Sequence, residues 1–218
     1  MRFDEYPYGS ISAIYDGLAA LYSRGRISAS KRFQIEAIRP GERILYAGVG
    51  SGADALEASR RGASVTAVDL SPQMLTRLAA RLDADALEAE LVQADVATHV
   101  PLEPFDVVVA NYFLNLFEVD RAEEMLGHLV SLLRPGGSLW ITDFARPCGG
   151  FVGRVTSEVY YRPANWIAWA VGFCALHPIL DYAPMLEALD LEIQNEQRLP
   201  VLLGRNPAFV SIEARRRA

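Results

Sequence analysis

Three glycines alternate with other residues in the segment LYAGVGSGADAL, at Gly48, Gly50 and Gly52. An apolar run leads into this segment, and a run typical of a helix leads out of it. Because glycine has no Cβ atom, the backbone can turn sharply here and a ligand can approach it closely. The helix that follows presents free N–H groups and the positive end of its dipole. The segment therefore predicts a turn that holds a pyrophosphate or a carboxylate.

An acidic residue, Asp69, ends the next apolar run along the chain. An acid about 20 residues beyond a glycine turn of this kind binds ribose hydroxyls. Dinucleotides and S-adenosylmethionine both carry such a ribose, and Gly48, Gly50 and Ala53 also match the dinucleotide fingerprint Gly-x-Gly-x-x-Ala. The two features together leave both ligand classes open. The structural alternative is that Asp69 caps a helix in competition with Ser71.

The composition narrows the class of partner. The 218 residues carry a formal net charge of −6, and 51% of them are hydrophobic. An acidic surface repels phosphate backbones, so we expect no nucleic acid partner. The hydrophobic fraction suits one domain with one sizeable core. The two cysteines, Cys148 and Cys174, form no CxxC pair, which predicts no zinc site and fits a reduced, cytoplasmic compartment.

Few segments of the chain could meet a membrane. The N-terminus MRFDEYPYGS has no basic stretch followed by an apolar one, so we expect no signal peptide. The longest apolar stretch, residues 166–180, is shorter than the ~20 residues that span a bilayer. It predicts a buried helix, a substrate lid or a peripheral contact with a membrane, and no transmembrane segment. The sequence leaves the oligomeric state open.

Short β-rich runs alternate with helical runs along the chain, which predicts a parallel sheet with right-handed crossovers. The expected strands are residues 43–47, 64–68, 87–93, 105–110, 138–143, 192–198 and 208–214. The expected helices are residues 11–21, 28–38, 52–61, 72–82, 120–133 and 181–189. Ser71 and Asp120 are the expected N-caps of two of these helices, and Arg134-Pro135-Gly136-Gly137 is expected to form a turn. The last two strands predict an antiparallel hairpin at the edge of the sheet.

Two later motifs favour one of the two ligand classes. Gln93-Ala94-Asp95 closes the third expected strand, where the class I S-adenosylmethionine-dependent methyltransferases carry an acid that meets the adenine amino group. Arg134-Pro135-Gly136-Gly137, which follows Leu132-Leu133, resembles the LxPGG turn of those enzymes. Over residues 15–143 the chain is similar to the small-molecule type of that family, with a ubiquinone-biosynthesis-like core. The last third of the chain resembles the family in outline.

The resemblance implies a fold, a domain plan and a cofactor. The fold is α/β, a Rossmann-like three-layer sandwich around a seven-stranded, mostly parallel sheet of order 3-2-1-4-5-7-6, with strand 7 antiparallel. Residues 1–218 would be a single methyltransferase domain. Its parts would be a helical cap (1–40), a cofactor-binding core (41–147), a substrate lid (148–180), and a final helix with a β-hairpin (181–218). The cofactor would be S-adenosylmethionine and the product S-adenosylhomocysteine.

The family's cofactor site carries over to this sequence position by position, with one departure. Asp69 would hold the ribose hydroxyls and Asp95 would meet the adenine edge, while Asn111 would lie below the sulfonium. The full set of implied contacts is Tyr46, Ala47, Gly48, Gly50, Asp69, Leu70, Met74, Asp95, Val96 and Asn111. Tyr46 is the departure, because the family usually carries an acid there to position the methionine amino group. That amino group must find another partner, with Asn111 and the N-terminal helices as candidates.

Methyl transfer from a sulfonium is an in-line displacement that needs no covalent nucleophile and no metal, so we expect no metal site. The protein has to exclude water and orient the acceptor, and orientation lowers a barrier by about 7 to 11 kcal/mol in favourable cases. His177, at the end of the aromatic-rich segment, is the candidate for accepting a proton or orienting the acceptor. Its alternative role is a polar lid residue bonded to backbone. Tyr15 resembles the aromatic residue that begins these domains near the cofactor, and it is the second catalytic candidate.

Aromatic clusters on both sides of the core predict a mostly apolar acceptor pocket. The substrate candidates are Tyr8, Tyr22, Tyr112, Tyr160 and Trp166, and core packing is the alternative for each. The segment Asn111-Tyr112-Phe113-Leu114 lacks the two prolines that nucleic-acid amino methyltransferases carry there. We therefore expect methyl transfer to the oxygen, nitrogen or carbon of a small aromatic or amphiphilic metabolite. A lipid or quinone methyltransferase at a membrane surface, an NAD-dependent oxidoreductase and a non-catalytic cofactor-binding protein stay open as alternatives.

Overall fold

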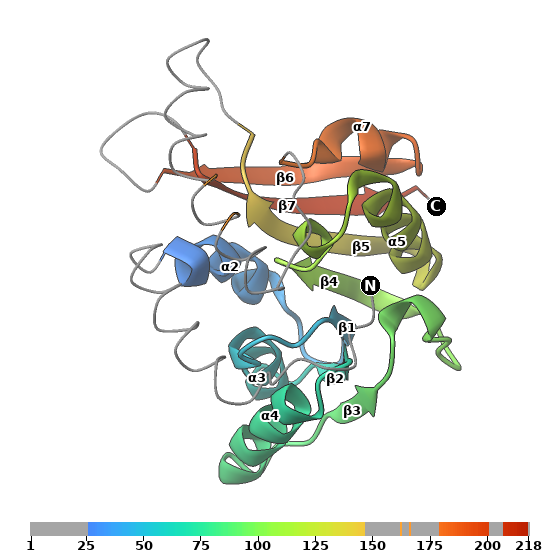
Figure 1. Cartoon of the computed structure of the whole chain (residues 1–218). Coiled ribbons are helices and arrows are strands. Elements are labelled where there is room, and N and C mark those ends of the chain that lie inside the picture. Colours follow the sequence, from blue (N-terminus) through green and yellow to red (C-terminus); the bar gives the residue numbers. More distant parts are fainter. Residues whose placement is uncertain (1–25, 147–161, 163–165, 167–178, 201–206, 218) are drawn as a thin grey trace.

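The computed structural model describes residues 26–146, 162, 166, 179–200 and 207–217. Within them one sheet of seven strands has the order β3-β2-β1-β4-β5-β7-β6, and β7 is antiparallel to both of its neighbours (Figure 1). This confirms the predicted sheet order and the predicted hairpin at the edge of the sheet. The strands are β1 (Arg43–Ala47), β2 (Ser64–Asp69), β3 (Glu90–Gln93), β4 (Phe105–Asn111), β5 (Leu133–Phe144), β6 (Leu191–Leu199) and β7 (Phe209–Arg216).

Helices cover both faces of the sheet and so make three layers (Figure 1). Helices α3 and α4 pack on one face with α2 beside α3, and helices α5 and α7 pack on the other face. The bounds are α2 (Arg26–Ala37), α3 (Ala53–Arg60), α4 (Pro72–Ala84), α5 (Val119–Ser131) and α7 (Tyr182–Glu187), with short 3-10 turns η1 (Val96–Thr98) and η2 (Leu114–Leu116). The first predicted helix, residues 11–21, lies outside the described residues. Among the helices that the structure describes, none has both the length and the apolar character needed to cross a bilayer.

Strand β4 shows why the sheet is buried on both faces. Val107 and Val109 point into the apolar cluster beneath α3 and α4, whereas Val108 and Ala110 point into the cluster beneath α5 and α7. Successive side chains of a strand face opposite sides, so a strand covered on both sides needs an unbroken apolar run. The first polar side chain after this run, Asn111, is therefore held in place at the end of a rigid strand.

The order of the last strands separates this sheet from the sheet of dinucleotide-binding proteins. That sheet has the order 3-2-1-4-5-6, because its second half repeats the parallel arrangement of its first half. Here β5 is followed in space by the antiparallel strand β7 and then by β6. The topology therefore argues against the NAD-dependent oxidoreductase that the glycine turn alone left open.

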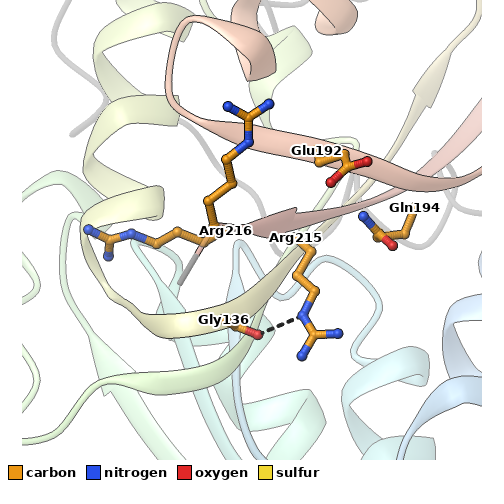
Figure 2. A pocket seen from close by; sticks show the side chains of 6 residues that line it. Gly136, Glu192, Gln194, Arg215 and Arg216 are labelled. Carbon is orange, nitrogen blue, oxygen red and sulfur yellow. Dashed lines mark hydrogen bonds between the residues drawn. The ribbon is translucent and has the colours of Figure 1, made fainter.

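The segment 134–137 is not the turn that the sequence predicts, but an irregular part of β5. The strand already begins at Leu133, and the register between β4 and β5 shifts across the segment. Arg134 forms an ion pair with Asp106 on β4. The carbonyl oxygen of Gly136 accepts a hydrogen bond from Arg215 Nε at 3.1 Å (Figure 2). These contacts on both sides keep the segment within the sheet as a bulge. A cavity of about 200 Å³ lies beside it.

Of the two predicted helix N-caps, one is confirmed and the other is wrong. Ser71 caps α4 as predicted, because its Oγ accepts a hydrogen bond from the Met74 N–H at 3.4 Å. Helix α5, by contrast, begins before the predicted cap Asp120. Glu118 is its N-cap, with its carbonyl oxygen accepting from the Ala122 N–H at 2.8 Å. Asp120 lies in the first turn instead, where an acid is favoured by the helix dipole.

Candidate functional site

A glycine turn and three polar residues, predicted from four separate parts of the sequence, lie along one edge of the sheet. The glycine turn follows β1 and Asp69 ends β2, while Asp95 comes just after β3 and Asn111 ends β4. These four strands are mutually parallel neighbours, so their carboxyl ends meet at the same edge. We call it the carboxyl edge. Ligands of open α/β sheets lie at this kind of edge.

Positions 48 and 50 in the glycine turn each favour glycine, and the space beside them differs. Both have left-handed backbone conformations, with φ of 74° and 54°, which other residues adopt only with strain. A Cβ atom on Gly48 would lie 2.7 Å from Phe113 Cδ2, so a packed ring already fills that space. A Cβ atom on Gly50 would meet no described atom within 4 Å. Among the described residues, Gly50 therefore faces open space where a ligand can approach the backbone.

The carboxylate of Asp69 ties the glycine turn to the end of β2. Its Oδ2 accepts a hydrogen bond from the Val49 N–H at 2.7 Å, and its Oδ1 accepts one from the Ser71 N–H at 2.8 Å. Burial raises the pKa of Asp69, and the N–H groups of Ser71, Val49 and Gly50 offset only part of that rise. A carboxylate has about four acceptor positions. Asp69 can thus hold the turn and still accept from a ribose hydroxyl.

The residues predicted to meet the adenine ring lie next to Asp69. Leu70 is 54% exposed although it follows a buried strand, and Met74 is half-buried on the first turn of α4. Asp95 is exposed, and its Oδ1 accepts from a backbone N–H of η1 at 2.9 Å. The side chain of Val96 is buried in the core, so only its main chain can face a ligand. The buried side chain of Ala47 leads to the same conclusion.

Four polar side chains meet between α2, α3 and the end of β4: Lys31, Gln34, Asp54 and Asn111. We call them the polar cluster. Lys31 Nζ lies 2.9 Å from Asp54 Oδ2. Asn111 Nδ2 donates to Asp54 Oδ2 at 3.1 Å and to Gln34 Oε1 at 2.9 Å. Burial raises the pKa of Asp54, but the charge of Lys31 and the hydrogen bonds from Lys31 and Asn111 outweigh it, so the pKa lies below its ordinary value.

Of the polar cluster, only Asn111 was predicted from the sequence. Asp54 lies in the first turn of α3, where an acid is ordinarily explained by the helix dipole. Lys31 and Gln34 belong to α2 and to no recognisable motif. The one available signal was an acid two residues after Gly52, the last glycine of the turn.

Tyr46, the departure from the family pattern, is buried beneath the start of α3. Its hydroxyl donates to the carbonyl oxygen of Asp54 at 3.1 Å. Burial and the nearby charge of Asp54 both raise the pKa of the phenol well above its ordinary value. Tyr46 is therefore neutral and cannot supply the negative charge that the family usually places here. Its contact with a cofactor stays a prediction.

Tyr112 follows Asn111 with a φ of 53°, a conformation that is uncommon outside glycine. Its hydroxyl lies 3.1 Å from Ser30 Oγ on α2. Its ring packs edge-on against Phe144 and Phe209, with centroid distances of 6.0 and 6.1 Å. These contacts join α2 to the sheet, which agrees with the packing alternative for Tyr112 and leaves a substrate contact as a prediction.

The remaining acceptor and catalytic candidates lie mostly beyond what the structure describes. Trp166 is described and is 61% exposed. The others lie outside the described residues: Tyr8, Tyr15, Tyr22, Tyr160 and His177. Most of the predicted lid, residues 148–180, also lies outside them. The structure thus brings together the predicted cofactor contacts, whereas the acceptor contacts stay predictions.

The lowered pKa of Asp54 predicts a specific loss of stability in acid. A carboxyl whose pKa is lower in the folded state stabilises the fold above its unfolded pKa, about 3.9, and this stability is lost as pH falls through the folded pKa. Asp54→Asn removes that contribution. We therefore expect the wild type to lose its advantage in free energy of unfolding over Asp54→Asn as pH falls below about 5 and on through the folded pKa, which lies below about 3.9. Urea unfolding at several pH values measures this difference.

Asp69 provides a control of opposite sign for that measurement. Its pKa is raised in the folded state, so the folded protein binds the proton more readily and gains stability as pH falls. As pH falls through this raised folded pKa toward about 3.9, the free energy of unfolding of the wild type should therefore rise relative to that of Asp69→Asn. Parallel changes in the two variants would contradict the assigned pKa shifts.

Comparison with known proteins places the site in context. The family described as "Methyltransferase domain" matches residues 44–137. A demethylmenaquinone methyltransferase of Thermus thermophilus is 32% identical over 161 residues, which cover 71% of this chain and 71% of the relative. The crystal structure of magnesium protoporphyrin IX methyltransferase from Synechocystis with bound S-adenosylmethionine has a TM-score of 0.63, covers 89% of this chain and 79% of its own, and is 18% identical. At that identity it shows a shared fold.

The chain is also similar to an uncharacterized protein of Mycobacterium tuberculosis, with 33% identity over 130 residues. The matched part covers 58% of this chain and 46% of that relative. The chain thus spans about half the length of the mycobacterial relatives that it matches.

Proposed function

The chain belongs to the class I S-adenosylmethionine-dependent methyltransferases, and on that premise we propose that it transfers the methyl group of S-adenosylmethionine to a small acceptor molecule. The acceptor is an aromatic or amphiphilic metabolite that is methylated on oxygen, nitrogen or carbon. The product of the cofactor is S-adenosylhomocysteine. Residues 148–180 serve as the acceptor lid in this proposal.

The link between Asp69 and the glycine turn carries the proposal. Asp69 fixes the turn through the Val49 N–H and keeps acceptor positions for ribose hydroxyls. The exposed apolar side chain of Leu70 beside it provides a surface for a flat base. Asp95, at the end of the neighbouring strand β3, is a hydrogen-bond acceptor for an exocyclic amino group. An adenosine requires these three kinds of contact, so the residues fit the cofactor.

Bound S-adenosylmethionine supplies a methyl group that its sulfonium already activates. The residues of the protein have to hold the acceptor atom in line with that methyl group and keep water away. We assign His177 to accept a proton from the acceptor, which contributes a factor of about 10² to 10⁴ where the acceptor is protonated. Tyr15 is assigned to the boundary between cofactor and acceptor.

A quinol acceptor is the second candidate. The relative that is 32% identical over 71% of the chain is named a demethylmenaquinone methyltransferase. An acceptor of that kind is aromatic and amphiphilic, and an apolar lid suits it. It would reach the protein from a membrane, so the apolar residues 166–180 would touch the membrane surface. Methyl transfer assays with a demethylated naphthoquinol and with water-soluble phenols separate the two candidates.

Titration with S-adenosylhomocysteine and with NAD tests the proposed cofactor. A ligand at 100 times its Kd stabilises a fold by about 2.7 kcal/mol, so we expect S-adenosylhomocysteine to raise the Tm of the protein and NAD to leave it unchanged. A shift with NAD and none with S-adenosylhomocysteine would overturn the proposal. Methyl transfer with candidate acceptors then distinguishes an enzyme from a protein that only binds the cofactor.

A further inference from the structure

We propose that the polar cluster binds the amino-acid end of the cofactor, with Asp54 and Asn111 accepting from its ammonium group and Lys31 and Gln34 donating to its carboxylate. The inference rests on the proposed function and adds a binding site that spans α2 and α3. It also supplies a partner for the ammonium group where Tyr46 replaces the usual acid.

The position of the polar cluster supports this assignment. Asp54 is two residues beyond Gly52, in the first turn of the helix that the glycine turn opens. Asn111 ends β4, the strand next to β1 at the carboxyl edge. The cluster therefore lies beside the glycine turn, away from Asp95 at the end of β3. A nucleoside held through Asp69 and Asp95 would direct its other end toward this side of the edge.

Two buried amide atoms of the polar cluster have no hydrogen-bond partner among the residues that the structure describes. They are Gln34 Nε2, a donor, and Asn111 Oδ1, an acceptor. Gln34 is only 2% exposed. Leaving a buried polar atom without a partner destabilises a fold, so an unpartnered donor and an unpartnered acceptor at one place indicate a ligand that carries both functions.

The charge of the polar cluster matches such a ligand. Lys31 and Asp54 carry one positive and one negative charge and lie 2.9 Å apart. The amino-acid end of the cofactor is a zwitterion with the same two charges. The ammonium offers three donors to Asp54 and Asn111, and the carboxylate offers acceptors to Lys31 and Gln34. When the ligand binds, Asp54 thus pairs with the ammonium and Lys31 with the carboxylate. Both ion pairs are neutral overall, so no net charge becomes buried.

Comparison of two ligands in calorimetric titrations tests the inference. S-adenosylhomocysteine has the amino-acid end, and 5′-methylthioadenosine lacks it while keeping the adenosine and the sulfur. In Gln34→Met, which keeps the size of the buried side chain, we expect the Kd of S-adenosylhomocysteine to rise about tenfold, the loss of one hydrogen bond to a charged group. The Kd of 5′-methylthioadenosine should stay unchanged. Glu36→Gln, at an exposed position of the same helix, should change neither Kd.

A second variant removes the charges without leaving one of them alone. The double substitution Lys31→Met with Asp54→Leu replaces a buried ion pair by apolar side chains, a change that is often tolerated by folds. We expect it to raise the Kd of S-adenosylhomocysteine at least tenfold (about 1.4 kcal/mol) and to leave the Kd of 5′-methylthioadenosine unchanged.

The outcomes separate this inference from the proposed function. Equal weakening of both ligands in Gln34→Met and in the double variant, or no weakening in either variant, would overturn the inference while the cofactor assignment stands. Binding of neither ligand to the wild type would overturn the cofactor assignment and this inference with it.

Discussion

Replacement of Asp69 by alanine is expected to raise the Kd of S-adenosylhomocysteine about 100-fold. A hydrogen bond to a charged group contributes about 1.5 to 3 kcal/mol, and two such bonds to ribose hydroxyls at the lower value correspond to about two powers of ten in affinity. The variant also removes the carboxylate oxygen that accepts a hydrogen bond from the Val49 N–H at 2.7 Å and so holds the glycine turn in place. Both effects act in the same direction. Calorimetric titration well below the Tm of the variant measures the loss on folded protein.

Three companion variants show whether the loss comes from the ribose contact. Asp69→Asn keeps one acceptor oxygen, so its Kd for S-adenosylhomocysteine should lie between those of the wild type and Asp69→Ala. Asp95→Asn should weaken binding by less, because it changes one contact with the base. Asp83→Ala, at an exposed position of α4, should have no effect. If Asp69→Ala and Asp83→Ala bind S-adenosylhomocysteine equally well, the ribose assignment is wrong.

The parts of the fold that local patterns control were predictable from the sequence. Strand β4 is an apolar run because the sheet is covered on both faces. Such a run indicates a buried strand without any knowledge of the residues that pack against it. Ser71 and Pro72 together indicate a helix start. The order of the strands, with the antiparallel β7, came from the family resemblance and could not have come from periodicity, which says nothing about which strands are neighbours.

The misassigned segments depend on contacts that are distant in sequence. Residues 134–137 look like a turn because they contain Pro135 and two glycines, but Arg134 pairs with Asp106 and Gly136 with Arg215. Those partners lie on the neighbouring strands β4 and β7, and no local rule contains them. The start of α5, by contrast, was misassigned for a local reason: its N-cap, Glu118, makes no side-chain capping hydrogen bond, so no capping residue marks the start in the sequence.

The residues of the candidate site likewise fall into a group that was predictable from the sequence and a group that was not. Asp69 was predictable because it ends a strand about 20 residues beyond the glycine turn, whereas Asp95 was predicted from the family resemblance. Lys31 and Gln34 were not predictable, because their contacts depend on how α2 packs: Lys31 pairs with Asp54 on α3, and Gln34 accepts from Asn111 at the end of β4. Asp54 was visible as an acid near the glycine turn, but its role depends on Lys31, which is 23 residues earlier in the chain.

Gly48→Ala is expected to lower the free energy of unfolding by about 2 to 6 kcal/mol. A non-glycine residue in a left-handed conformation costs roughly 1 to 3 kcal/mol, and an extra carbon in a packed core costs about as much again. Both apply here, because φ is 74° and the new Cβ would lie 2.7 Å from Phe113 Cδ2. Urea unfolding measures the change. Phe113→Leu in the same chain should restore part of the loss, since it removes the ring but not the backbone strain.

Gly50→Ala is the matched control, because it shares the backbone conformation without the steric contact. It should cost only the strain of a left-handed residue, about 1 to 3 kcal/mol. Its Cβ would instead enter the open space beside the turn, so the affinity for S-adenosylhomocysteine should fall more than the stability does. The pair therefore separates the two functions of one turn, with Gly48 making room for the core and Gly50 for the ligand. Equal stability losses in the two variants, without rescue by Phe113→Leu, would show that backbone strain alone acts at both positions.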